Sequence, residues 1–263
     1  MKILQMATYD VEQPDHGGKL RSHHIRRSLR SRFSVETLSF EWGDTQDISS
    51  LSVKLDQRRW TEFGISGMLS DWGICVFLEK EKSCYDRVCK HVRDFNPDMI
   101  LLEQPFLWPL VERFFRDGTL GQHVKVIYSS HNIEVVMKRQ IYRDLYSPEV
   151  AAEYTTYVDD LERGVIKACA GAIAVSELDA DYISEVSPGT PVQIYFNGHS
   201  RPVSGSEDKN GSLALLIGML TGYLLVAGIR LILMGCAILL WRCRKIKRTK
   251  ISPCGYLAVR VMV

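Results

Sequence analysis

The residues best suited to chemistry follow short apolar runs in the first 200 residues. His131 and Asn132 come soon after the run Val124–Tyr128, and Glu134 is close behind. A histidine there could act as a base or hydrogen-bond a sugar hydroxyl or a phosphate. Asn132 could equally cap the next helix, with Glu134 near the start of that helix. On position alone, this structural capping interpretation is the stronger of the two.

Two glycines, Gly17 and Gly18, lie between the first apolar run and a helix candidate. Glycines let the backbone approach a ligand closely, and a helix N-terminus offers free N–H groups and a positive dipole to a phosphate. The pair lacks the GxGxxG spacing of dinucleotide-binding turns, so tightly bound NAD is disfavoured. A plain turn between strand and helix is the alternative.

Basic side chains surround and follow this glycine turn: His16, Lys19, Arg21, His23, His24, Arg26, Arg27, Arg30 and Arg32. They could attract an anionic substrate or an anionic lipid surface, or they could form a solvated helix face. No aromatic interleaving and no fold signal accompanies them, so nucleic acid is not an expected partner.

Ser176 and Asn197 follow two later apolar runs and are further candidates for substrate binding. Ser176 precedes Glu177, a pattern typical of a helix N-cap, and Asn197-Gly198 is a turn signal. For Ser176, capping is the stronger interpretation. The seven cysteines have irregular spacing and form no CxxC pair. The cysteine pattern therefore indicates neither a metal site nor a disulfide framework.

The elements that must position these residues alternate along the chain. We predict strands at 2–9, 34–40, 99–102, 124–128, 172–175 and 192–196, and helices at 19–30, 85–95, 110–115, 148–170 and 178–186. Residues 41–75 give no clear pattern. Alternation of this kind predicts an α/β fold, a Rossmann-like parallel sheet with helices on both faces. We expect one crevice at the carboxyl ends of the strands, lined by 10–18, 103–106, 129–134, 176–177 and 197–198.

The charge distribution divides the chain. The 263 residues carry a net charge of +2, but from Ser212 onward there is no Asp or Glu and eight Lys or Arg, which leaves −6 for residues 1–211. We therefore expect a domain at 1–200, a linker at 201–211, an apolar segment at 212–241 and a basic tail at 242–263. The N-terminus does not have the pattern of a signal peptide, so residues 1–211 are expected to be cytoplasmic.

Several segments together resemble the N-terminal domain of GT-B glycosyltransferases of the family-4-like group. They are 2–9 with the glycine pair, Pro97–Leu102, Ser130–Glu134, the run from Leu161 to Glu177, and Tyr195–Gly198. None is specific alone, and together they cover about residues 1–200. The resemblance predicts the N-terminal half of a GT-B fold, with a second domain that binds a nucleotide-sugar.

The resemblance also implies roles for individual residues. His131 would face the reacting hydroxyl of a sugar, lipid or polyol acceptor, with Gly17 and Gly18 near the donor diphosphate. Chemistry is metal-independent in many members, so no metal and no cofactor is expected, the nucleotide-sugar being a co-substrate. A donor domain would need about 150 further residues, which the tail does not resemble. We therefore expect the chain to be inactive alone.

Two interpretations of the tail remain open. The segment 212–241 is long enough to span a bilayer as a candidate transmembrane helix, which would give membrane association. Neither orientation of this helix in a membrane is favourable, because Arg230 lies inside the segment and basic residues follow it. A frameshift near residue 218 removes the conflict and would leave an apolar helix or a disordered tail. The rival function is a membrane-anchored, non-catalytic protein that binds a sugar or a phosphate.

Overall fold

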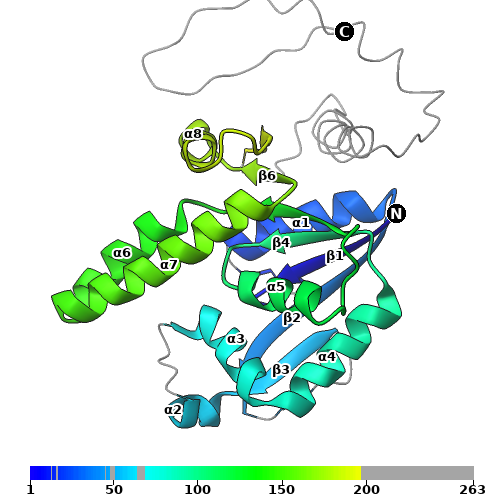
Figure 1. Cartoon of the computed structure of the whole chain (residues 1–263), viewed down its shortest axis with the longest axis horizontal. Coiled ribbons are helices and arrows are strands. Elements are labelled where there is room, and N and C mark those ends of the chain that lie inside the picture. Colours follow the sequence, from blue (N-terminus) through cyan, green and yellow to red (C-terminus); the bar gives the residue numbers. More distant parts are fainter. Residues whose placement is uncertain (13, 16, 45, 48–50, 64–68, 197–263) are drawn as a thin grey trace, which may run out of the picture. The chain divides into compact units, whose positions relative to one another are not determined.

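The computed structural model describes residues 1–196, except 13, 16, 45, 48–50 and 64–68. Seven parallel strands form one sheet in the order β3-β2-β1-β4-β5-β6-β7 (Figure 1). The strands are β1 (Lys2–Ala7), β2 (Ser34–Gly43), β3 (Ser52–Asp56), β4 (Met99–Glu103), β5 (Lys125–Ser129), β6 (Gly171–Ala174) and β7 (Val192–Ile194). This is the predicted Rossmann-like α/β fold.

Helices connect most of the strands. They are α1 (Gly17–Arg30), α2 (Trp60–Phe63), α3 (Ser70–Lys80), α4 (Lys82–Phe95), α5 (Trp108–Arg116), α6 (Glu134–Leu145), α7 (Pro148–Ala168) and α8 (Glu177–Val186), with a 3-10 turn, η1, at Gln57–Arg59. Helix α4 ends at Asn96, whose φ of 51° is the left-handed conformation that often closes a helix.

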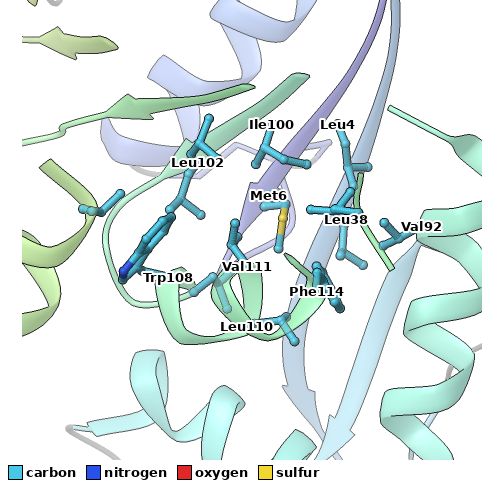
Figure 2. Packing of buried hydrophobic residues seen from close by; sticks show 14 of the residues in the cluster. Leu4, Met6, Leu38, Val92, Ile100, Leu102, Trp108, Leu110, Val111 and Phe114 are labelled. Carbon is cyan, nitrogen blue, oxygen red and sulfur yellow. The ribbon is translucent and has the colours of Figure 1, made fainter. Parts of the chain in front are cut away.

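The two faces of β1 have different partners, because side chains alternate along a strand. Leu4 and Met6 are fully buried and lie among the residues of α5, including Val111 and Phe114 (Figure 2). Gln5 points to the other face, where its amide donates to the main-chain oxygen of Ser22 in α1 at 3.1 Å. Helices α1 and α5 therefore cover opposite faces of the sheet, as predicted.

The described residues between β2 and β3 are 44, 46, 47 and 51, and none of them is helical. Asp47 pairs antiparallel with Lys54 of β3. Parallel strands are usually joined by a longer, helical crossover. Strand β3 pairs with β2 only from Ser39 onward, so no described strand pairs with this edge of β2 before Ser39. We call this part, which includes the polar Glu36 and Thr37, the uncovered edge of β2.

The sequence prediction missed several elements. Strand β3, η1, α2 and the first half of α3 lie in the stretch 41–75, where no periodicity is visible. Helix α6 was also missed, because its side chains form only a short buried stripe. The remaining boundaries shifted by a few residues; β7, for example, ends at Ile194 and not at 196. Helices α6 and α7 lie side by side in a hairpin (Figure 1).

Several predictions concern residues outside the described ones. They are Asn197 as a binding residue, the linker at 201–211, the apolar segment at 212–241 and the tail at 242–263. The choice between a membrane anchor and a frameshifted tail therefore stays open. Within the part that the structure describes, no helix has both the length and the apolarity needed to cross a membrane.

Candidate functional site

The candidate site lies where the strand order reverses direction, between β1 and β4. In open parallel sheets, ligands bind at the carboxyl ends of the strands at this switch point. Strand β1 continues there into Thr8, and β4 ends at Glu103, followed by Gln104. Strand β5, the next neighbour, leads to Ser130 and His131. Gln104 donates its main-chain N–H to the oxygen of Ser129 at 3.2 Å, which ties the two ends together.

A buried carboxylate and a histidine form the centre of the site. His131 Nε2 lies 2.8 Å from Oε2 of Glu103, whose side chain is fully buried, while 6% of the His131 side chain is exposed. Gln5 donates its amide to the other oxygen of Glu103 at 2.6 Å. Both oxygens of this carboxylate therefore have a partner, as a buried charge requires.

The electrostatics of this pair assign the histidine tautomer. Burial raises the pKa of Glu103, but the hydrogen bond and charge of His131 and the amide of Gln5 outweigh it, so the pKa lies below its ordinary value. An ionised carboxylate can only accept, so His131 donates through Nε2. In the neutral ring Nδ1 then has the lone pair, and Nδ1 is the atom that could take a proton.

Helix α1 holds the histidine from the other side. Ser22 Oγ lies 3.4 Å from His131 Nε2, and Tyr9 OH lies 2.8 Å from the same Ser22 oxygen. Burial, followed by the nearby Glu103, raises the pKa of Tyr9, so the phenol stays protonated. Arg21, one residue before Ser22, donates to the main-chain oxygen of Tyr195 at 2.8 Å. This contact brings the segment after β7 to the same helix.

A second carboxyl group lies beside the first pair. Glu134 is fully buried, and its Oε1 accepts from Gln104 at 3.2 Å, whereas Oε2 has no hydrogen-bond partner in the described residues. Burial raises its pKa to about 7, although the charge of Lys138 opposes the shift. Lys138 pairs with Asp71 at 2.9 Å, and Asp71 lies 3.3 Å from the Thr8 hydroxyl.

The backbone of Gln104, whose side chain bonds this second carboxyl group, is strained. Gln104 has a φ of 66°, a left-handed conformation that is uncommon for a side chain of this kind. Such strain is often found where a binding site requires an unusual orientation. Here it places the Gln104 amide between Thr8, 3.3 Å from its oxygen, and Glu134.

Asn132 does not cap α6, which corrects one prediction. The N-cap residue is Ile133, whose apolar side chain makes no capping hydrogen bond. Glu162 of α7 supplies the acceptor instead: its two oxygens accept from the N–H groups of Glu134 at 2.9 Å and Val135 at 3.0 Å. Because this carboxylate occupies the capping position, Asn132 points away and contacts the sulfur of Met137 at 3.8 Å.

The glycine pair opens α1, two residues earlier than the helix was predicted to start. Gly17 is exposed, and apart from its chain neighbours and the backbone of its own helix, no described atom lies within 4 Å of the position that its Cβ would take. The first turn contains no acidic side chain. Both features leave room for an anion at the N-terminus of α1. Gly18 is partly buried in the same turn.

Ser176 caps α8. Its hydroxyl accepts from the N–H of Asp179 at 3.2 Å and also bonds the Asp179 carboxylate. Both observations agree with the capping interpretation of this residue. The structure therefore pairs His131 with Glu103 and Glu134 with Gln104, the residue after Glu103, while Ser176 caps its own helix.

No family model and no curated protein sequence matches the chain. The function must therefore be argued from the site itself. Sequence reasoning placed Glu103 and Gln104 in the correct turn without giving them a role, and it missed Gln5 and Ser22. An acidic residue that ends a buried strand, such as Glu103, is the signal that could have been used. In the described residues, no group of three or more His, Cys, Asp and Glu is arranged to hold a metal ion.

The expected single crevice takes a different form. A groove of about 1000 Å³ is lined by Asp10 and Glu12 of the first turn, but its other walls come from α1, β2, β3 and α4. His131 and Glu103 are not among the described residues that line it. The carboxyl ends of β1, β4 and β5 meet through direct hydrogen bonds, and the groove lies towards the uncovered edge of β2.

Proposed function

We propose that residues 1–196 form the acceptor-binding half of a nucleotide-sugar-dependent glycosyltransferase. In this proposal, His131 takes the proton from the acceptor hydroxyl. The observation that carries the proposal is the Glu103–His131 pair at the switch point of the sheet. A histidine with one nitrogen bonded to a buried carboxylate and a lone pair on the other is a suitable general base.

The role of Glu103 follows from its position. When His131 gains a proton at Nδ1, the ring becomes cationic, and the carboxylate 2.8 Å from Nε2 stabilises that charge. Glu103 remains ionised throughout, because Gln5 bonds its other oxygen. This carboxylate is a positioning residue for the histidine and does not itself contact the acceptor.

Two further features support a sugar or polyol acceptor and a phosphorylated donor. Hydroxyl, amide and carboxyl groups of Thr8, Gln104 and Asp71 form a hydrogen-bonded cluster that includes the residue after Glu103, and such groups hydrogen-bond hydroxyls well. The N-terminus of α1, with the open space beside Gly17, suits a diphosphate. In the family that the sequence resembles, the donor itself is held mainly by a second domain.

Binding of simple polyols by the full chain tests the acceptor role. Mannose, glucose, myo-inositol and glycerol serve as probes in saturation-transfer NMR. We expect at least one to bind saturably to the wild type and to bind much more weakly to His131→Asn. Lys125→Gln, at the opposite end of β5, is the control and should bind like the wild type. Failure of all four probes, or equal binding by His131→Asn, would contradict the proposal.

A transfer assay with the full chain tests the expected inactivity. The chain is incubated with UDP-glucose or GDP-mannose and the polyol that binds, and release of the nucleoside diphosphate is measured. We expect no release, because the chain is expected to be inactive without a donor domain. Release that disappears in His131→Asn would contradict that expectation and would assign catalysis to this residue.

A further inference from the structure

A second polar region lies on α1, on residues that the proposed glycosyltransferase function does not use. A pocket of about 290 Å³ is lined by four basic side chains and one acidic one: His23, Arg26, Arg27, Arg30 and Glu12. The four basic residues recur at helical spacing, so they share one side of α1. Glu12 comes from the turn that precedes the helix.

Arg26 is the unusual member of this set. Its side chain is only 3% exposed, yet it lines both this pocket and the larger groove. One guanidinium nitrogen, Nη2, donates to Glu12. Nε and Nη1 are buried and have no hydrogen-bond partner in the described residues. A buried guanidinium with unsatisfied donors is costly, which indicates that a partner is missing.

Glu12 is a weak substitute for that partner. Its side chain is 59% exposed, and the hydrogen bond of Arg26, reinforced by the charges of Arg26 and Arg30, lowers its pKa. Glu12 is therefore ionised at neutral pH. One of its oxygens bonds Arg26 and lies 3.9 Å from Arg30, so it leaves the other donors of Arg26 unsatisfied. An exposed carboxylate of this kind can swing out of the pocket.

We propose that this pocket binds the phosphate group of a ligand, with Arg26 at its base and Glu12 displaced on binding. A phosphate has several oxygens and can accept from the planar guanidinium through two parallel bonds. Arg27 and Arg30 add positive charge around it. His23 donates through Nδ1 to the main-chain oxygen of Val11 at 3.0 Å, so Nε2 of the neutral ring has the lone pair and can accept from a protonated phosphate oxygen.

The larger groove indicates where the rest of the ligand lies. Arg26 and Arg30 also line this groove, and beyond them its wall includes the hydroxyl-bearing Thr37, Ser39 and Ser52. Charged groups of both signs also line it: Asp10, Glu36 and Asp94 are acidic, and Lys2 and His91 are basic. Hydroxyl groups and charges of both signs suit a polar group. The ligand class is a phosphate ester whose remaining part is polar.

Calorimetric titration of the full chain with inorganic phosphate and with glycerol 3-phosphate tests the site. We expect saturable binding at low salt, and binding about tenfold tighter for Glu12→Gln, because the competing charged hydrogen bond is removed. Arg26→Gln should abolish binding, while Arg32→Gln, an equal change of charge outside the pocket, should leave it unchanged. Circular dichroism establishes that each variant is folded.

The Glu12→Gln variant keeps the test valid if Arg26→Gln does not fold. No saturable binding by the wild type and Glu12→Gln, or equal affinity in both, would overturn the proposal. A second arm uses vesicles of phosphatidylcholine with and without phosphatidic acid. Binding of the soluble phosphates alone identifies a soluble phosphate ester. Additional Glu12-dependent binding only to vesicles with phosphatidic acid identifies a lipid headgroup as the source.

Discussion

Two buried charged groups of this protein differ in how completely their hydrogen bonds are made. Glu103, at the end of β4, has a partner for each of its oxygens, His131 and Gln5. Arg26, on α1, has one exposed acidic partner, and its Nε and Nη1 have no hydrogen-bond partner among the described residues; it lines a cavity. Both side chains are almost completely removed from water.

The difference indicates what each region is prepared for. A buried pair whose hydrogen bonds are complete has a defined geometry, which suits a proton transfer that needs fixed atoms. A buried guanidinium with incomplete bonding gains energy from an added anion, which suits ligand binding. The first region should therefore be sensitive to loss of either partner, and the second should tolerate loss of Glu12.

The largest expected effect comes from His131→Ala. This change leaves the Glu103 carboxylate buried without its strongest partner, and we expect a loss of about 3 kcal/mol in the free energy of unfolding. Urea denaturation at pH 7 measures it. The double variant His131→Ala with Glu103→Gln should recover part of the loss, because it removes the unpaired charge. Equal stability of His131→Ala and the wild type would show that the pair is not satisfied as described.

The substitution Glu134→Gln should change the free energy of unfolding by a similar or smaller amount, and it should stabilise the protein. Its pKa is about 7 in the folded protein against an ordinary 4.5, so between these pH values the folded state binds the proton that the unfolded state releases. Stability should fall as pH rises through this range. Glu134→Gln should therefore be more stable than the wild type at pH 8, by up to about 3 kcal/mol.

Thermal unfolding at pH 5 and pH 8 measures this difference. The advantage of Glu134→Gln should shrink towards pH 5, where the wild-type carboxyl group is largely protonated. Glu153→Gln, on the exposed surface of α7, is the control and should show no such pH dependence. The same advantage at both pH values would contradict burial as the cause.

The smallest effect is expected for Glu12→Ala. Its side chain is 59% exposed, and it bonds only one guanidinium nitrogen of the buried Arg26, so water screens the carboxylate and we expect it to contribute less than about 1 kcal/mol. We expect a change below that value by urea denaturation in phosphate-free buffer. A loss as large as that of His131→Ala would remove the distinction between the two regions, because Glu12 would then be an integral partner of Arg26.

The sequence predicted the fold much better than the site. Apolar runs such as Met99–Leu102 are buried and are visible in the sequence, so the alternation of strands and helices along the chain and the parallel sheet followed from them. The stretch 41–75 failed because β3 is a strand of only five residues that follows soon after β2. His131 was found because it follows a clear strand.

The partners of His131 were not predicted, because they come from distant parts of the chain. Gln5, Ser22 and Glu103 are brought together only by the pairing of β1 with β4 and the packing of α1. The surroundings of Arg26 could not be predicted from the sequence either. The sequence placed it in a basic cluster, but its burial and its unsatisfied donors depend on the three-dimensional packing.

The capping of α6 by Glu162 has a consequence for the order of folding. The first N–H groups of α6 are bonded only when α7 is in place, and Tyr128 in β5 also donates to Glu162 at 3.2 Å. The two helices are adjacent in the chain, so their contacts close a short loop and can form early. The hairpin should therefore open and close as one cooperative unit, docked on β5 through this carboxylate. Hydrogen exchange at the amides of Glu134 and Val135 would follow that opening directly.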